Sequence, residues 1–466
     1  MQTMRHRARW AALCAAAIAL PLGACNVRDE LLSPQQPGTI LPGDLSGAGV
    51  AGAEALRTGA LGRFQQLSPG GGNGNQTEAT LLGDLLTDVW KSGDTFSQHN
   101  ETDQRIVQTN NSVLSTAYSD LNRSRGFYRD AIASLRTWVS DKPAEIAEQY
   151  FIMGYSEMLL GELFCNGIPL SETVDGVFTY TKPLTDQEVF AIAITHLDSS
   201  LALITGSDAL STSVKNAAQV AKGRTLVDMA KFPEAAAAVA SVPTNYTYNV
   251  TFSQATNDNN IWNLAGQVST RARFVVGDSF DTQGLIKNAL PFSSAKDPRV
   301  PTTGSPTSNG TKAIDGITPL VSQQIWVNRS DPVPVATGVD ARLIEAEAKL
   351  RANDIPGMLA ILNALRGSAQ TLGPLAVAAM PALPAPTTSD SATSLFFREK
   401  AFWQFSRGYR FGDLRRMVRQ YGRQSNQVWP SGTFFKGGSY GPDVNFPVTD
   451  NEKTNPQFAG CIDRKA

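Results

Sequence analysis

The chain has 466 residues, 42% of them hydrophobic, which is ample for a large buried core. Its 41 basic and 42 acidic residues nearly balance, so the formal net charge at pH 7 is −1. This composition gives no electrostatic footprint for nucleic acid, and we therefore expect no nucleic-acid partner.

The start of the chain predicts a lipoprotein signal peptide. Three arginines precede an apolar run at residues 10–20, which is too short to span a bilayer. The tetrapeptide LGAC at residues 22–25 matches the lipobox of bacterial lipoproteins. We therefore predict that residues 1–24 are removed and that Cys25 carries acyl chains, such as palmitate, that hold the protein on a membrane. The alternative is an ordinary signal peptide with a chance cysteine at its cleavage site.

A short spacer follows this cysteine. Residues 25–45 are short on aromatic residues and rich in Pro, Gly and Ser, which is typical of a flexible tether above a membrane. The sequence therefore predicts three segments: the signal peptide at 1–24, the tether at 25–45 and a folded domain at 46–466.

Helical periodicity dominates the predicted domain. Pro143 suits the first turn of one helix, and Thr185 with Glu188 forms a capping box for the next. Two later segments each predict a pair of helices packed through small residues, with breaks at Pro233 and at residues 353–356. Such pairs resemble tetratricopeptide repeats with irregular spacing. The predicted fold class is therefore mainly α.

Two segments depart from the helical pattern. Residues 245–335 carry Thr, Asn, Pro and aromatic residues in short runs, which predicts a loop-rich insertion containing a few short strands. Residues 376–394 are of low complexity and rich in alanine and proline. We expect this second segment to be exposed and poorly ordered.

A basic, aromatic stretch lies near the C-terminus at residues 395–423. Its pattern predicts one amphipathic helix with aromatic residues on one side and eight basic residues elsewhere. One interpretation is a surface for nucleic acid or phosphate. The other is that its arginines pair with carboxylates such as Glu399 and Asp413, and the net acidic chain favours this second interpretation.

With this stretch in view, the chain resembles the SusD/RagB family of nutrient-binding outer-membrane lipoproteins. The match rests on the pattern RE-AF--F--GYRF-DLRR at residues 398–416, on the segment EAEA…LN-LR upstream and on the closing Phe446-Pro447 and Asn455-Pro456. The resemblance implies a SusD-like fold, no enzymatic activity and no cofactor. It also implies a lipid-anchored place at the outer membrane, on the cell surface, where an oligosaccharide or another nutrient is passed to a TonB-dependent (SusC-like) transporter.

The residues themselves assemble no catalytic or metal motif. Only His99 and His196 remain once the signal peptide is removed, which leaves little material for a zinc site. A Ser-x-x-Lys match at residues 293–296 lacks its companion elements. We therefore expect no metal and no enzyme. A lipid-anchored glycan hydrolase and a helical-repeat scaffold that binds only protein stay open as alternatives.

Three tryptophans are candidates for ligand binding. Trp90, Trp262 and Trp326 each stand beside Asn, Gln or Asp, a mixture that stacks on a sugar ring while bonding its hydroxyls. The alternative for each of them is half-buried packing under a loop.

Two cysteines remain after export. Cys14 leaves with the signal peptide and Cys25 is lipidated, so Cys165 and Cys461 are left. In an exported protein such a pair invites a disulfide, and the alternative is two separate buried thiols.

Overall fold

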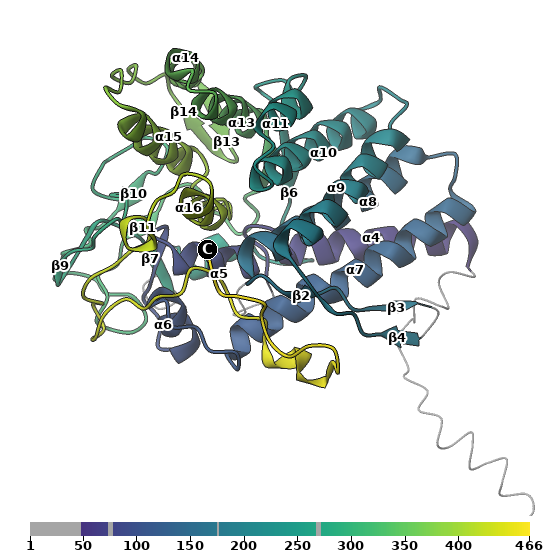
Figure 1. Ribbon diagram of the computed structural model, residues 1–466, viewed down its shortest axis with the longest axis horizontal. Coiled ribbons are helices and arrows are strands. Elements are labelled where there is room, and N and C mark those ends of the chain that lie inside the picture. Colours follow the sequence, from purple (N-terminus) through teal and green to yellow (C-terminus); the bar gives the residue numbers. More distant parts are fainter. Residues whose placement is uncertain (1–47, 73–77, 175–176, 267–271) are drawn as a thin grey trace, which may run out of the picture. The chain divides into compact units, whose positions relative to one another are not determined.

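Long helices make up one half of the structure, and the other half contains shorter helices and many loops (Figure 1). The computed structural model describes residues 48–72, 78–174, 177–266 and 272–466. The predicted signal peptide and tether, including Cys25, lie outside these residues. The described part is mainly α-helical with a few short strand pairs, which confirms the predicted fold class.

The N-terminal helices form an array in which neighbours along the chain contact one another. Pro143 lies in the first turn of α8, and Thr185 and Glu188 form the capping box of α9, as the sequence predicts. The helices of the array are α4 (Gly49–Leu67), α7 (Ser112–Trp138), α8 (Pro143–Leu163), α9 (Asp186–Leu203), α10 (Ala209–Asp228) and α11 (Phe232–Val239).

Glycines allow α8 and α9 to approach closely. A Cβ atom on Gly154 would lie 2.8 Å from Leu197 Cγ, and one on Gly161 would lie 2.6 Å from the ring of Phe190. Contacts that short do not occur between real side chains, so any larger residue would push the two helices apart. Small residues thus set the spacing of this helix pair.

The two predicted helix pairs are α10–α11 and α13–α14. Pro233 and Pro356 lie in the first turns of α11 and α14, where a missing N–H costs nothing. The sequence places the first break at Pro233, but α10 already ends at Asp228 and Pro233 belongs to the next helix. The second pair consists of α13 (Gly338–Arg351) and α14 (Ile355–Arg366).

The links within these two pairs have the same geometry. Ala230 and Asn353 have φ angles of 59° and 58°. The N–H groups that follow, of Lys231 and Asp354, each donate at 2.8 Å to the carbonyl five residues earlier. Both links are therefore Schellman motifs, which reverse the chain in a few residues.

The C-terminal basic stretch is two helices rather than one. Its helices are α15 (Ser389–Trp403) and α16 (Arg410–Arg419). Between them Ser406 and Gly408 have positive φ angles of 56° and 71°. A Cβ on Gly408 would lie 2.7 Å from Thr80, so this turn packs directly on α5 (Ala79–Leu86). The prediction of one continuous helix is wrong because this tertiary contact bends the chain.

The segment at 376–394 is also more structured than the sequence predicts. Its last residues form the first turn of α15, where Thr388 and Ser391 make a capping box. Further upstream, Leu383 N–H donates to Asn363 Oδ1 at 2.8 Å and ties the segment to α14. A hairpin of β13 (Gln370–Leu372) and β14 (Leu375–Val377) leads into it, and the end of β14 is part of the segment.

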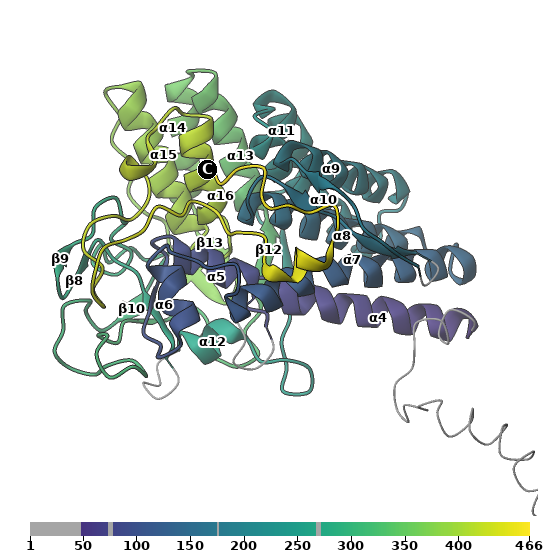
Figure 2. The ribbon, with the colours of Figure 1, turned by 60° about the horizontal axis from the view of Figure 1, so that its bottom comes forward.

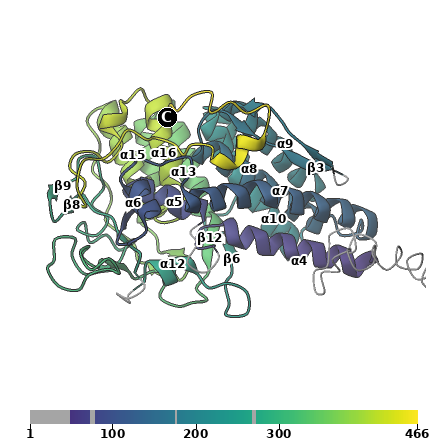
Figure 3. The same cartoon turned by 90° about the horizontal axis from the view of Figure 1, so that it is seen from below.

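The predicted loop-rich insertion is confirmed. Its strands form short antiparallel pairs, one of them with β1 from outside the insertion. Figures 2 and 3 show β8, β9 and α12 (Asn260–Leu264) lying away from the first turns of α4. The strand pairs are β1 (Trp90–Ser92) with β7 (Phe274–Val276), β6 (Thr247–Val250) with β12 (Val333–Thr337), β8 (Phe280–Asp281) with β9 (Gly284–Leu285), and β10 (Thr302–Thr303) with β11 (Ser322–Gln323).

The remaining elements are short. They comprise α6 (Ser97–Asp103), β2 (Ile168–Pro169) paired with β5 (Pro183–Leu184), β3 (Glu172–Val174) paired with β4 (Val177–Thr179), and the 3₁₀ helices at Ser425–Gln427 and Asp450–Thr454.

A disulfide joins Cys165 to Cys461, which confirms that pairing. Their Cα atoms are 6.0 Å apart, and the bond attaches the end of α8 to the last residues of the chain. Hydrogen bonds reinforce this attachment: Cys165 N–H donates to Phe446 O at 2.8 Å, and Ile462 N–H donates to Asn166 O at 2.7 Å. The C-terminal segment is therefore attached at two places, Phe446 and residues 461–462, to the residues that directly follow α8.

Candidate functional site

Two of the three candidate tryptophans are core residues. Trp90 is 1% exposed, and its indole N–H donates to Ser406 Oγ at 3.1 Å. Trp326 is 2% exposed, and its indole N–H donates to Pro332 O at 3.1 Å. An indole enclosed on both faces offers no plane to a sugar. The prediction that Trp90 and Trp326 bind ligand is therefore corrected: both pack under loops, which is the alternative interpretation.

Trp262 is the candidate that stays at the surface. It lies half-buried in α12, where Asn259 Oδ1 accepts its backbone N–H at 3.2 Å. The guanidinium carbon of Arg329 lies 5.4 Å from the centroid of the indole ring. Arg329 Nε is in turn 3.1 Å from Asp258 Oδ1. An aromatic plane, a cation and a carboxylate thus meet where the start of α12 contacts the loop that carries Arg329.

An open pocket of about 250 Å³ lies between α4, α7 and the start of α5. Short apolar side chains form part of its wall, and the rest of the lining is polar. This mixture offers both donors and acceptors, as a site for a polyhydroxylated ligand requires. The polar residues are Arg63, Gln66, Glu78, Thr116, Asp120 and Arg123.

The two carboxyl groups of this pocket are desolvated. Burial raises the pKa of Glu78 well above its usual range, although its carboxyl oxygen accepts Leu81 N–H at 2.7 Å as the N-cap of α5. Burial also raises the pKa of Asp120, and Arg123 and Arg63 oppose that rise. Such carboxyl groups keep their protons more readily and can both donate and accept hydrogen bonds.

The pocket and the Trp262 surface share a structural support. Asn260 N–H donates to Gly70 O at 2.8 Å, and the Asn260 side chain donates to Gly71 O at 2.7 Å. Gly72, the next residue, lines the pocket. The helix that carries Trp262 is therefore fastened to one wall of the pocket.

The basic C-terminal stretch is buried and paired with carboxylates. Arg407 lies 2.5 Å from Asp340, and Arg410 lies 2.7 Å from Asp88. These four residues are at most 6% exposed. The interpretation that the arginines pair with carboxylates is thus confirmed, but these partners come from distant parts of the chain and the pairs lie in the core.

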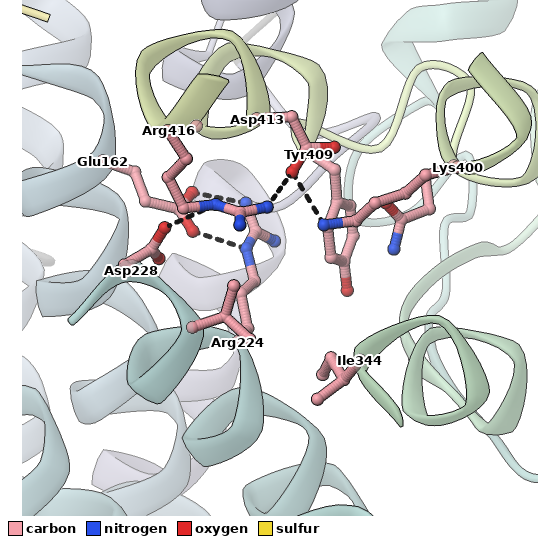
Figure 4. Close-up of a pocket in the computed structure, with 11 residues that line it drawn as sticks. Glu162, Arg224, Asp228, Ile344, Lys400, Tyr409, Asp413 and Arg416 are labelled. Carbon is pink, nitrogen blue, oxygen red and sulfur yellow. Dashed lines mark hydrogen bonds and ion pairs between the residues drawn. The ribbon is translucent and has the colours of Figure 1, made fainter. Parts of the chain in front are cut away.

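The two carboxylates named from the sequence both take part. Glu399 is contacted by Arg299 at 2.7 Å and by Arg366 at 3.1 Å. Asp413 accepts from Lys400 at 2.7 Å and also from Arg416. Figure 4 shows Asp413 between Lys400 and Arg416. In the same network Arg416 also reaches Asp228, and Arg224 pairs with Glu162.

This network surrounds a second cavity, which is too small for a nutrient. The enclosed space measures about 10 Å³, close to what a single water molecule needs. Ionic side chains with partners of their own form most of its wall. The cavity is therefore part of the packing between helices and not a candidate ligand site.

The described residues hold neither a cluster of metal ligands nor a candidate membrane span. No group of three or more His, Cys, Asp or Glu side chains is placed there to hold a metal ion. In the same part of the chain, no helix has both the length and the apolar character needed to cross a membrane.

Sequence comparison finds no match, whereas structural comparison does. No protein-family model and no curated protein matches the sequence. A SusD superfamily protein from Bacteroides vulgatus has 15% identity and a TM-score of 0.57, covering 88% of this chain and 98% of its own. A SusD/RagB family protein from Bacteroides thetaiotaomicron has 12% identity and a TM-score of 0.58, covering 87% and 94%.

A SusD-like carbohydrate-binding protein from Bacteroides fragilis matches equally well. Its TM-score is 0.61 at 13% identity, and the match covers 86% of this chain and 97% of that protein. The chain has the SusD-like fold. The SusD-like fold accounts for both halves of the structure, since the matches extend over nearly the full length of each solved protein.

Sequence reasoning missed the pocket of this SusD-like chain. Arg63 and Gln66 come from α4, whereas Asp120 and Arg123 come from α7, more than 50 residues later. Each pair on its own has the spacing of ordinary polar positions on an amphipathic helix. Only the packing of α4 on α7 turns them toward one space, so no local signal identified them.

Proposed function

We propose that this protein is a lipid-anchored outer-membrane protein that captures a nutrient, in the first place an oligosaccharide, and passes it to a TonB-dependent transporter. The observation that carries the proposal is the SusD-like fold, which covers 88% of this chain in the match from Bacteroides vulgatus. The lipobox at residues 22–25 supports the anchor and a place on the cell surface. The protein acts by binding and release, without chemistry on its ligand.

The Trp262 surface is the proposed contact for the sugar. A sugar ring stacks its C–H face on the indole, while Arg329 and Asp258 bond its hydroxyl groups. The neighbouring polar pocket accepts a further unit of the same ligand. Weak and fast binding suits this task, because a ligand held tightly would leave too slowly for delivery.

Replacing Trp262 by alanine is expected to weaken oligosaccharide binding about tenfold or more, because the stacking plane is lost. The measurement is titration calorimetry with a panel of oligosaccharides. Trp138→Ala is the matched control, since Trp138 is 44% exposed at the end of α7 and far along the chain from α12. Both variants should keep the melting temperature of the wild type.

Equal affinities of the wild type and the Trp262→Ala variant would remove this surface from the proposal. Turnover of a glycan by the purified wild type would instead favour the hydrolase alternative.

Replacing Cys25 by serine is expected to move the protein from the membrane fraction to the soluble exported fraction. The reason is that acyl chains contribute ~0.8 kcal/mol per buried CH₂ group, and serine cannot carry them by a thioether. Fractionation followed by mass spectrometry of the N-terminus measures both location and lipidation. A variant that still sediments with membranes, together with an unmodified native N-terminus, would contradict the anchor.

The proposed transporter partner has its own test. In detergent extracts of the native protein, a TonB-dependent barrel should copurify.

A further inference from the structure

Two arginines line the open pocket between α4 and α7, which lie side by side (Figure 3). Arg63 comes from α4 and is half-buried, whereas Arg123 comes from α7 and is exposed. Neither guanidinium forms an ion pair with a carboxylate of the described residues. The C-terminal arginines differ, since Arg407 and Arg410 are each paired with an acid. The pocket therefore holds two positive charges to which no carboxylate of that part of the chain is bonded.

The contacts of Arg63 hold its guanidinium in place without neutralising it. Its Nη1 donates to Gln66 Oε1 at 3.0 Å. Its guanidinium carbon lies 4.9 Å from the centroid of the Phe127 ring. An arginine has five N–H donors, and the amide of Gln66 uses only one of them. A guanidinium held by an amide and an aromatic ring keeps its full charge for a ligand.

Neither acid of the pocket is bonded to these arginines. Glu78 Oε1 accepts from Leu81 N–H at 2.7 Å and from the Thr80 hydroxyl at 2.6 Å, and its Oε2 accepts from Thr80 N–H. The Glu78 carboxyl group is thus committed to the start of α5. Asp120 lies one turn before Arg123 on α7, and no ion pair within the described residues joins the two. Burial raises the pKa of Asp120, so this carboxyl group holds a proton more readily and opposes an incoming anion less.

The pocket has room for one sugar unit. Its volume is about 250 Å³, and a cavity of about 150 Å³ already accepts a six-membered ring. Gln66 and Thr116 add neutral hydrogen-bonding groups to the lining, which suit the hydroxyl groups of a sugar. A planar carboxylate matches the fork of N–H donors on a guanidinium, and such charge-assisted hydrogen bonds are about twice as strong as neutral ones.

We propose that this pocket binds the carboxylate of an acidic sugar, a uronic acid unit of the captured oligosaccharide. The inference rests on the proposed function, because it names the class of ligand that the same binding protein captures. Arg63 and Arg123 pair with the carboxylate, and Gln66 and Thr116 bond the hydroxyl groups of the ring. The acidic unit thus adds charge recognition to the stacking on the Trp262 surface.

Titration calorimetry with paired ligands tests this assignment. The probes are oligogalacturonate and oligoglucuronate, each compared with its methyl ester, which has the same sugar skeleton without the charge. The wild type should bind the acid about tenfold or more tightly than the ester. This preference should shrink as the NaCl concentration rises from about 50 to about 500 mM, because salt screens exposed charges.

Arg63→Gln and Arg123→Gln should each remove most of the preference for the acid and leave the affinity for the ester unchanged. Arg136→Gln is the matched control, since Arg136 is an exposed arginine of the same α7 that contacts Tyr150 and lies outside the pocket. It removes the same charge and should keep the preference of the wild type. Arg63→Lys keeps the charge but not the planar fork, so its preference should lie between those of the wild type and Arg63→Gln.

Asp120→Asn tests the opposite sign. It removes the negative charge beside the two arginines, so the acid should bind more tightly while the affinity for the ester stays the same. Weaker binding of the acid by this variant would show that Asp120 holds the ligand, and the assignment to the arginines would fail.

The outcomes separate this inference from the proposed function. Equal affinities for acid and ester, or an unchanged preference in both glutamine variants of the pocket, would overturn the carboxylate site and leave oligosaccharide capture intact. Binding of a sulfated oligosaccharide in place of both uronates would overturn it as well. If the wild type binds no acidic or neutral oligosaccharide at all, the proposed function itself is contradicted.

Discussion

Replacing Cys461 by serine is expected to lower the free energy of unfolding by about 2–5 kcal/mol. The disulfide closes a separation of 296 residues, so its loss releases much of the unfolded chain from a constraint. Cys461 is the half-buried partner, whereas Cys165 is fully buried. Serine at 461 therefore avoids placing a hydroxyl group in the core.

Denaturant unfolding without reductant measures this effect. Wild type treated with reductant should unfold at the midpoint of the Cys461→Ser variant, and reductant should leave the variant unchanged. Hydrogen exchange should also become faster in the C-terminal segment, which the disulfide and the bond from Ile462 to Asn166 hold against α8. A variant with the wild-type midpoint would show that the hydrogen bonds alone hold the segment.

Replacing Asp340 by alanine is expected to cost about 3–5 kcal/mol, because it leaves a buried arginine without its counter-ion. Asp340 is 0% exposed and accepts from Arg407 at 3.1 and 2.5 Å. It also accepts from Gln404 at 2.8 Å and from Tyr409 at 3.1 Å, and it completes the capping box of α13 with Thr337. One side chain thus anchors the turn between α15 and α16 to a helix N-terminus.

Asp390→Ala is the matched control for this prediction. Asp390 pairs with Arg423 at 2.8 Å, but its side chain is 82% exposed, so its loss should cost less than about 1 kcal/mol. A double variant that replaces Asp340 and Arg407 by apolar residues should recover part of the stability, since no buried charge is then left unpaired. Equal effects of Asp340→Ala and Asp390→Ala in thermal or denaturant unfolding would contradict the buried-pair account.

Asp340 also predicts how the protein responds to acid. The Arg407 guanidinium and the surrounding hydrogen bonds lower the pKa of Asp340 against the opposing effect of burial. Its contribution to stability is therefore present above about pH 4 and is lost as the pH falls through the folded-state pKa.

The sequence by itself determined the features that depend on neighbours within one or two helical turns. Pro143 and the pair Thr185 and Glu188 mark helix starts, because caps and first-turn prolines act through hydrogen bonds only three or four residues away. The same local periodicity gave the mainly helical class and the loop-rich insertion. The disulfide depended on elimination, since only two cysteines were available after export.

Only the tertiary structure decided which side chains meet. Trp90 and Trp262 stand in similar polar sequence, yet one is enclosed in the core and the other stays half-buried at the surface. The arginines of residues 395–423 follow a helical pattern. Their partners include Asp340 and Asp88, however, and Asp88 lies more than 300 residues away from Arg410 along the chain. Periodicity shows that a residue faces another part of the chain, and it does not show which part, because that choice depends on how complete helices pack together.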